Sequence, residues 1–440
     1  MTARPRIAVI GGGYAGMAAA QAFCERGAHV AVFEAAKVLG GRARRIQYRD
    51  ETLDNGQHIL SGAYSTLLQL MQRAGGPATD LKRIPLTLSM PPAFRMRAPR
   101  WPAPLHLAAA LLGARGLGWA DRFAALGMMR ALRASNYQVD PTQTVAAMLS
   151  AHRQTSALLR HVWQPLAVGA LNTPIDSASA QVFAHVLRDA LDAKRDASDL
   201  LLPCVDLSAL YPERAAALVR ERGGEVLTGC RVDALAPRAA AIDLRFDGQA
   251  RTYDAVIVAV GPHQLASLEA PGCLDGAKAA EFAFEQIVTV YFKFAAAVRL
   301  PEPMLGQADG RVQWFFDRRD LLHPNARDGL IAGVISAAGS PSTTDAAAGE
   351  GTFETLAWRE LSVHCPQAPE PEWTKTVTEK FATIACTPAL HARRPACATS
   401  HPRVFLAGDY VHSPYPATLE SAARSGVDAA RAALASITPH

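Results

Sequence analysis

The chain has 440 residues, 49% of them hydrophobic and 19% charged, and a formal net charge of +5. This length exceeds one ordinary domain and predicts two or three domains with buried cores. The small positive charge is spread over arginine-containing stretches, which argues against a nucleic-acid partner and is compatible with an anionic lipid surface. Seven scattered cysteines without a C-x-x-C pair indicate a reducing, cytoplasmic environment. No run of about 18 uncharged apolar residues is present, so we expect no membrane-spanning helix.

The first 35 residues have the pattern of a strand, a glycine turn, a helix and a second strand. Gly11, Gly13 and Gly16 follow the first strand in G-x-G-x-x-G spacing, which permits a tight turn and close approach of the backbone to a pyrophosphate. Glu34 ends the second strand, where its carboxylate can bind ribose hydroxyls and repel a 2′-phosphate. The pattern predicts a Rossmann-like domain that binds a dinucleotide other than NADP.

Two segments after this unit favour FAD over NAD. LGGRARR, with Gly41 and Arg42, resembles the G-G-R segment of the amine-oxidase flavoprotein superfamily, and Arg42 can pair with the pyrophosphate. DNGQH, with Gly56, Gln57 and His58, matches the place where these families bring a backbone loop against the isoalloxazine ring, an approach that glycine permits. The resemblance therefore implies FAD bound by these five residues.

Residues 85–199 lack strand alternation, are rich in Ala, Leu and Arg, and predict a mainly helical insertion that encloses the substrate. Within it, the apolar stretch from Leu105 to Trp119, with Arg100 and Arg115 beside it, is typical of a segment that lies on a bilayer surface. We therefore expect a cytoplasmic protein that is peripheral on the cytoplasmic membrane.

The rest of the chain returns to the nucleotide domain and adds a second sheet. Short strands in residues 200–278 belong, with 1–84 and 396–440, to a discontinuous FAD-binding domain, and Val232 lies where the superfamily contacts adenine. Residues 279–395 combine strand-like segments with one helix and predict a sheet-containing substrate domain. The expected fold class is α/β, a GR2-type flavoprotein with a Rossmann-like FAD-binding domain and a substrate domain of mixed sheet plus helical insertion.

The C-terminal segment VFLAGDYVHSPYPATLESAARSG resembles the FAD motif of plant-type carotenoid desaturases. The resemblance implies that Gly408 and Asp409 reach a ribityl hydroxyl and that the following helix, from about residue 417 to 434, points its N-terminus at the flavin. Thr418 and Leu419 complete these contacts, and Pro416 suits the first turn. No cysteine follows this motif, so we expect FAD to be noncovalent. No H-x-x-x-H or paired-cysteine pattern occurs, so we expect no metal.

Three further segments narrow the reaction. They are DNGQHILSGAY, PLAVGALNTPIDSASAQVFAHVLRDAL and SDLLLPCVDLSALYPERAA, and with both FAD motifs they resemble the hydroxysqualene dehydroxylase family. That family implies a long-chain isoprenoid substrate, an allylic alcohol that reduced FAD converts to squalene by hydride transfer. Three alternatives stay open: a carotenoid or squalene-type desaturase, an amine oxidase with Tyr410 and Tyr415 flanking the flavin, and a flavin-bearing lipid carrier.

The reaction requires a group that protonates the leaving hydroxyl, because hydroxide leaves poorly. Asp54 and His58 are the first candidates, with Asp206 behind them, since burial raises a carboxyl pKa toward neutrality. Packing roles are the alternatives: Asp206 as the N-cap of a helix over LSALYPERAAALV, Asn172 as a cap, Asp199 as a solvated acid. The electron donor is left open between NAD(P)H and a reductase partner.

Overall fold

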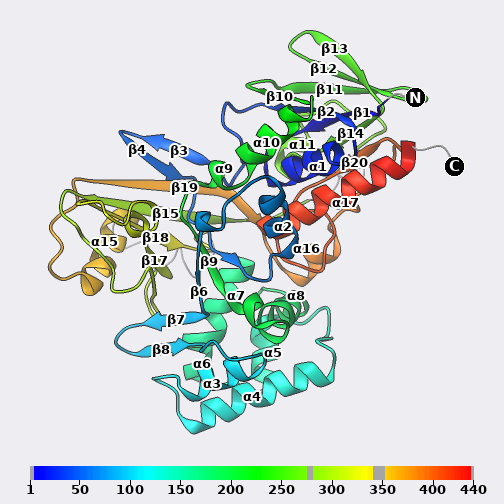
Figure 1. The fold of residues 1–440 in the computed structure, drawn as a ribbon. Helices are drawn as coiled ribbons and strands as arrows, with labels where there is room; N and C mark the ends of the chain where they lie inside the picture. Colours follow the sequence, from blue (N-terminus) through cyan, green and yellow to red (C-terminus); the bar gives the residue numbers. More distant parts are fainter. Residues whose placement is uncertain (1–3, 275–280, 340–351, 438–440) are drawn as a thin grey trace.

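A five-stranded parallel sheet forms the centre of the nucleotide-binding domain. The computed structural model describes residues 4–274, 281–339 and 352–437. The strand order is β10 (Glu225–Thr228), β2 (His29–Glu34), β1 (Arg6–Ile10), β14 (Ala255–Val258) and β20 (Val404–Leu406). Strands from both ends of the chain thus meet in one sheet (Figure 1), so this domain is discontinuous in sequence.

The two faces of this sheet are covered differently. Alternate strand residues such as Ile7 and Val9 pack against helices, whereas Ala8 and Ile10 pack against a second, antiparallel sheet. The helices are α1 (Tyr14–Cys24), α10 (Pro212–Glu221) and α17 (Leu419–Ile437), and the antiparallel strands are β11 (Val232–Pro237), β12 (Ile242–Phe246) and β13 (Gln249–Tyr253). Both faces are therefore dry, which explains the continuous apolar runs of the parallel strands.

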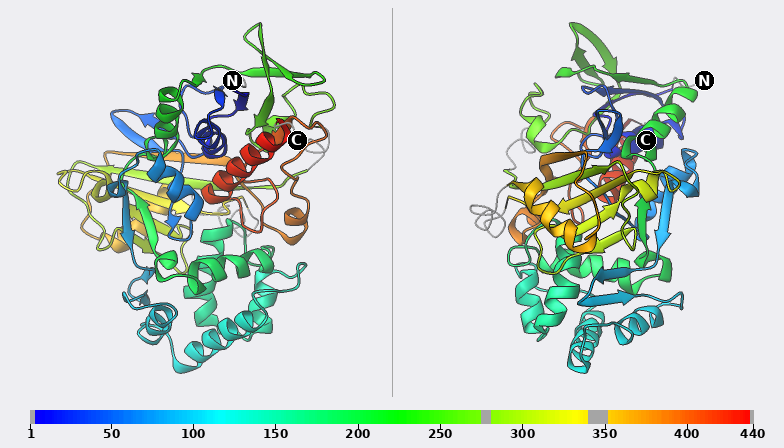
Figure 2. Two further views of the ribbon diagram at one scale, coloured as in Figure 1. Left: turned by 45° about the vertical axis from the view of Figure 1, so that its right-hand side comes forward. Right: turned by 90° about the vertical axis from the view of Figure 1, so that its left-hand side faces the viewer.

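The substrate domain is built on a five-stranded antiparallel sheet. Its order is β16 (Met304–Gly306), β17 (Trp314–Asp317), β18 (Gly329–Ile335), β15 (Phe284–Phe294) and β19 (Trp373–Ile384). Helix α15 (Phe353–His364) covers one face of it, where Val288, Val290 and Phe292 pack against Leu356 and Leu361. Residues of the opposite face, among them Tyr291, Trp314 and Phe316, belong to one buried cluster with residues of the helical insertion, which lies below the sheet (Figures 1 and 2).

The insertion contains helices and also a hairpin that the sequence analysis missed. Its helices are α3 (Leu105–Leu112), α4 (Trp119–Ala134), α5 (Val145–Ala151), α6 (Ser156–Leu158), α7 (Gln164–Leu171) and α8 (Ala180–Leu187). Strands β7 (Thr87–Met90) and β8 (Phe94–Arg97) pair antiparallel before them. In β8, Phe94 and Met96 are buried while Arg95 and Arg97 are exposed, so the predicted absence of strand alternation was wrong.

Short strands and helices join these parts. The strands are β3 (Arg45–Tyr48), β4 (Glu51–Asp54), β5 (Leu60–Ser61), β6 (Leu81–Ile84) and β9 (Leu200–Pro203), and the helices are α2 (Ser65–Arg73), α9 (Leu207–Leu210), α11 (Pro262–Leu265), α13 (Arg318–Leu322) and α16 (Pro388–Ala392). Because β6 pairs with β9, the insertion leaves and re-enters the fold at neighbouring strands. The single helix predicted after Asp206 is two helices, since Tyr211 leaves helical geometry and Pro212 starts α10.

Candidate flavin site

A cavity of about 710 Å³ lies between the nucleotide-binding domain, the substrate sheet and helix α7. Its walls include residues of both predicted FAD motifs, together with residues of β15, β17, β18 and β19. Segments far apart in the sequence thus share one cavity.

The glycine loop between β1 and α1 forms one wall. Gly11 has φ +109°, and a Cβ there would lie 2.6 Å from the Ala259 carbonyl oxygen. A Cβ on Gly16 would lie 1.9 Å from the Gly11 carbonyl oxygen, so Gly16 serves packing and does not line the cavity. Gly13 does line it, and a Cβ there would meet nothing closer than Gly41 Cα at 3.7 Å. The loop therefore presents bare backbone at the N-terminus of α1.

Glu34 and Val232 lie at the same end of the cavity. The Glu34 carboxylate accepts hydrogen bonds from the backbone nitrogens of Gly12 at 2.6 Å and Ala36 at 2.8 Å. Val232 begins β11, two residues after Cys230, whose nitrogen donates to the Glu34 carbonyl oxygen. Both side chains line the cavity where the sequence predicts ribose and adenine contacts.

Arg42 and Asp409 form an ion pair on the cavity wall. The guanidinium Nη2 and the carboxylate Oδ1 are 2.5 Å apart, although the two residues are 367 positions apart in sequence. Arg42 also donates to the carbonyl oxygens of Phe381 and Ala382 in β19. The residue predicted to bind the pyrophosphate, Arg42, thus lies next to the residue predicted to bind a ribityl hydroxyl, Asp409. Both are beside the backbone of Gly41 and Gly408.

The loop of Gly56, Gln57 and His58 forms the opposite wall. Gly56 has φ +141°, a conformation that side-chain-bearing residues rarely adopt. Gln57 is 8% exposed, and its Oε1 has no hydrogen-bond partner among the described residues. His58 Nδ1 lies 3.0 Å from the Gly56 carbonyl oxygen, and burial, with Arg42 nearby, lowers its pKa from 6.5. The loop thus offers an unused acceptor and a neutral imidazole to a ligand.

The N-terminus of α17 closes the cavity beside α1. Thr418 and Leu419 line it, and Thr418 Oγ1 accepts from Ser421 N as a cap. The helix begins at Leu419, so the expectation that Pro416 belongs to its first turn was wrong. Glu420 does not face the cavity: its carboxylate accepts from Thr66 and Leu67 nitrogens and caps α2.

Two of the three proposed proton donors are outside the cavity. Asp54 is 2% exposed and receives hydrogen bonds from Leu207 N at 2.8 Å and Arg318 Nη2 at 3.0 Å. Asp206 Oδ1 accepts from the Ser208 and Ala209 nitrogens and so caps α9. Neither carboxylate lines the cavity, so the prediction that they act on a substrate is corrected, and His58 remains at the site.

Asn172 and Asp199 both have packing roles in the structure. Asn172 ends α7 in left-handed geometry, donates to Thr383 Oγ1 and accepts from Ala337 N, so it is a C-cap that lines the cavity. Asp199 was expected to be solvated, but it is 1% exposed and paired with Arg195 and Arg83. That expectation was wrong, because Asp199 directly precedes the buried strand β9 and its carbonyl oxygen accepts from Gly62 N.

One part of the substrate-sheet wall is apolar, whereas Glu379 and Thr383 of β19 add polar groups to the rest of it. The apolar part is formed by Ile287, Trp314, Phe316 and Val334, with Gly169 and Ala170 of α7 beside them. The carboxylates among the described lining residues are Glu34, Glu379 and Asp409, and each has a hydrogen-bond partner. This apolar part of the wall therefore fits an uncharged, apolar molecule.

Two polar residues of the site escaped the sequence analysis. Glu379 lines the cavity and accepts a hydrogen bond from Asn55 Nδ2 at 2.7 Å. Arg394 is 5% exposed and donates to the carbonyl oxygens of Asp409, Tyr410 and Tyr415, which holds the loop of the C-terminal motif. Neither residue lies in a recognisable motif. The sequence signal for Arg394 is only its position before the Gly408–Asp409 pair.

The walls together fit FAD better than a smaller cofactor. Bare glycine backbone and two helix N-termini suit a pyrophosphate. The Gln57 Oε1 and the Tyr410 hydroxyl are buried polar atoms on the cavity wall that have no hydrogen-bond partner in the part of the chain that the structure describes. A parallel nucleotide-binding sheet that shares such a cavity with an antiparallel substrate sheet defines a two-domain flavoprotein.

Comparison with known proteins agrees with this class. The profile of the family described as flavin containing amine oxidoreductase matches residues 14–434. Hydroxysqualene dehydroxylase of Rhodopseudomonas palustris is 30% identical over 441 residues, 97% of this chain and 98% of its own, and that of Sinorhizobium fredii is 29% identical over 443 residues, 97% of each. Putrescine oxidase superposes with a TM-score of 0.69 at 16% identity, covering 98% of this chain and 99% of its own.

The chain belongs to the flavin-containing amine oxidoreductase family and, within it, to the hydroxysqualene dehydroxylase family. It is an FAD-dependent oxidoreductase with an α/β flavoprotein fold.

Proposed function

We propose that this enzyme binds FAD noncovalently and uses it to remove the allylic hydroxyl group of hydroxysqualene, forming squalene. The relatives named hydroxysqualene dehydroxylase support the reaction. Cys230 is the cysteine among the described lining residues, and burial raises its thiol pKa to about 11. A neutral thiol at the Glu34 end of the cavity supports a noncovalent cofactor.

The observation that carries the proposal is the apolar wall of Ile287, Trp314, Phe316 and Val334. A polyamine would need an unpaired carboxylate there, whereas an isoprenoid chain gains from burial against apolar side chains. The aromatic pair considered for an amine oxidase is absent from the described cavity wall, because Tyr410 lines the cavity while Tyr415 pairs with Asp189 outside it. The site therefore favours a long hydrocarbon.

Reduced flavin supplies a hydride to an electron-deficient carbon when it is bound. The chain's own residues must exclude water, hold the hydrocarbon and deliver a proton to the leaving hydroxyl. The apolar wall serves the first two tasks. His58 serves the third in its protonated form: it lines the cavity, its Nδ1 is engaged with Gly56, and Nε2 has no hydrogen bond to the described residues, so the imidazolium can hold the transferred proton on Nε2.

A single-turnover experiment tests this function. Anaerobic, photoreduced enzyme mixed with hydroxysqualene should form squalene in an amount equal to the flavin that is reoxidised. Oxidised enzyme that introduces double bonds into squalene would instead establish a desaturase. Bound hydroxysqualene released unchanged from reduced enzyme would indicate a lipid carrier.

A further inference from the structure

A cluster of exposed apolar side chains lies on the helical insertion. Among the described residues, six of the eight exposed large hydrophobic side chains come from a short stretch of the chain that ends within α4. The six are Trp101, Leu105, Leu112, Trp119, Phe123 and Leu126. We call them the α3–α4 face. Trp119 is 64% exposed and Phe123 67%, values that a side chain packed within a domain does not reach.

The segment that carries this face is mainly cationic, although Arg95 and Arg133 pair with Glu302 and Asp192 of other segments. Residues 85–134 contain seven arginines and a single acidic residue, Asp121. Asp121 is used internally, because its carboxylate accepts from Gly118 N at the start of α4. Arg97, Arg100, Arg115 and Arg130 are exposed. An anionic partner is therefore favoured electrostatically over a neutral or cationic one.

The face is held in place by its own packing. Arg122 lies 4.9 Å from the Trp119 ring centroid and donates to the carbonyl oxygens of Leu111 and Ala114. These contacts join α4 to the end of α3, while Leu111 and Met128 are buried beneath. The exposed rings thus project from a built surface, at the end of the molecule farthest from the nucleotide-binding sheet (Figures 1 and 2).

We propose that the α3–α4 face docks on the surface of an anionic lipid bilayer. Tryptophans prefer the interface between water and hydrocarbon, and nearby arginines are attracted to anionic headgroups. No helix among the described residues has the length and apolar character to cross a membrane. Docking by a surface patch is the mode that this combination of rings and cations supports.

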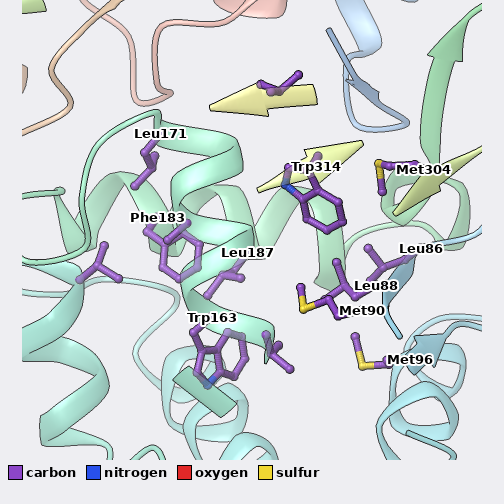
Figure 3. Packing of buried hydrophobic residues seen from close by; sticks show 14 of the residues in the cluster. Leu86, Leu88, Met90, Met96, Trp163, Leu171, Phe183, Leu187, Met304 and Trp314 are labelled. Atoms are coloured by element: carbon purple, nitrogen blue, oxygen red, sulfur yellow. The ribbon is translucent and has the colours of Figure 1, made fainter. Parts of the chain in front are cut away.

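An apolar core joins this face to the cavity. Leu111 and Met128 belong to the same buried cluster as Trp314 and Phe316, which line the cavity wall. Figure 3 shows part of this cluster, with Leu88 and Met90 between Trp314 and Met96. Six of the nine methionines lie in the cluster or against it, and their flexible side chains adapt to a moving hydrocarbon. The α3–α4 face and the flavin cavity thus border on the same apolar core.

Vesicle flotation of the full-length, flavin-loaded enzyme tests the proposal. Substrate is omitted, so the result does not depend on the proposed reaction. The protein should float with vesicles of phosphatidylcholine mixed with phosphatidylglycerol, and less with phosphatidylcholine alone. The double variant Trp119→Gln/Phe123→Gln should weaken binding roughly tenfold or more. Val363→Gln is the matched control, because Val363 is 71% exposed but lies on α15.

The charged residues are tested separately. Arg115→Gln/Arg130→Gln should weaken binding to the anionic vesicles by roughly fivefold for each arginine removed, with Arg222→Gln on the nucleotide-binding domain as the control. Unchanged flavin content and melting temperature show that each variant is folded. Failure of the wild-type enzyme to float overturns the proposal, as does equal binding by the Trp119/Phe123 variant. Loss of self-association without loss of vesicle binding would assign the face to a second copy of the chain.

Discussion

Gly11, Gly13 and Gly16 share one turn but have three different surroundings. A Cβ on Gly11 or Gly16 would collide with a neighbouring carbonyl oxygen, whereas a Cβ on Gly13 would meet nothing closer than 3.7 Å; Gly11 and Gly13 both line the cavity. The same sequence pattern therefore combines two packing requirements with one ligand requirement. A substitution at Gly13 separates ligand binding from folding.

Gly13→Val should produce a folded protein without flavin. The β-carbon meets no described atom closer than 3.7 Å, so the added methyl groups extend toward the space in which we expect the pyrophosphate. Absorbance of the purified variant and its melting temperature without added FAD would check both statements. Full flavin content in this variant would show that the pyrophosphate lies elsewhere.

His58 links protonation to turnover. Burial and Arg42 lower its pKa from 6.5, so the imidazolium that could donate a proton is lost as pH rises through this lowered value. We expect kcat/KM to fall with rising pH already below pH 6.5. His58→Gln should remove this limb and lower the rate by about 10²- to 10⁴-fold, at unchanged flavin content. If His58→Gln keeps the pH profile of the wild-type enzyme, a residue other than His58 donates the proton.

A buried ion pair connects strand β4 to helix α13. Asp54 and Arg318 are 2% and 3% exposed at their side chains, and Arg318 also donates to the Pro203 carbonyl oxygen. Burial raises the pKa of Asp54 from 3.8 to about 6 despite the opposing effect of Arg318. The folded state thus binds the proton more tightly than the unfolded state, and the contribution of Asp54 to stability falls as pH rises from about 4 to 6.

Arg318→Gln should destabilise the protein by about 3–5 kcal/mol at pH 8, where it leaves a buried carboxylate unpaired. At pH 5 the loss should be smaller, because Asp54 with a pKa of about 6 is then mostly protonated. Urea unfolding at both pH values measures the difference. In Asp54→Asn/Arg318→Gln the pH dependence of the loss should disappear; its persistence would implicate a different acid.

Helices α1 and α17 cross at a glycine and jointly present their N-termini to the cavity. A Cβ on Gly426 would lie 2.1 Å from the Ala15 carbonyl oxygen, which is backbone and cannot rotate away. Ala15 and Ala422 both line the cavity. The close approach at Gly426 therefore sets the distance between the two N-termini.

Gly426→Ala should lower stability by about 1–3 kcal/mol and weaken flavin binding, because the helices must separate. Gly127→Ala is the control: Gly127 is exposed within α4, with open space around its Cβ, and should gain up to about 1 kcal/mol. Thermal unfolding and flavin titration distinguish the two variants. Equal changes in stability and flavin affinity in both variants would mean that the helix propensity of alanine outweighs the close contact between α1 and α17.

The cavity lies between domains, so flavin binding should stabilise both of them. Gly13 and Gly56 belong to the nucleotide-binding side, whereas Ala170, Trp314 and Thr383 belong to α7 and the substrate sheet. A ligand that binds only the folded form stabilises it by about 2.7 kcal/mol at a hundredfold excess over Kd. The whole two-domain unit should share this gain.

Hydrogen exchange with and without FAD measures this coupling. Removing FAD should accelerate exchange at residues 11–16 and 55–58, and also at 379–383 in the other domain. The hairpin of β12 and β13 should be unaffected, because it does not line the cavity. Faster exchange confined to residues 11–16 would show that the cofactor does not bridge the domains.

The nucleotide-binding motifs could be predicted from sequence because each is local. Arg6 to Glu34 form one βαβ unit, and Gly408 with Asp409 lies between a strand and a helix, so backbone geometry dictates the residue types. The reaction family also followed from contiguous segments. Periodicity alone was weaker: it missed the β7–β8 hairpin and the break between α9 and α10.

The partners of the charged residues were decided by tertiary structure. Asp54 meets Arg318 across 264 positions, Arg42 meets Asp409 across 367, and Asp199 meets Arg83 across 116. An aspartate or glutamate is the same letter in the sequence whether its carboxylate caps a helix, forms a buried ion pair or faces a substrate. Only packing sets its burial and its neighbours, and these determine its pKa and therefore its chemistry.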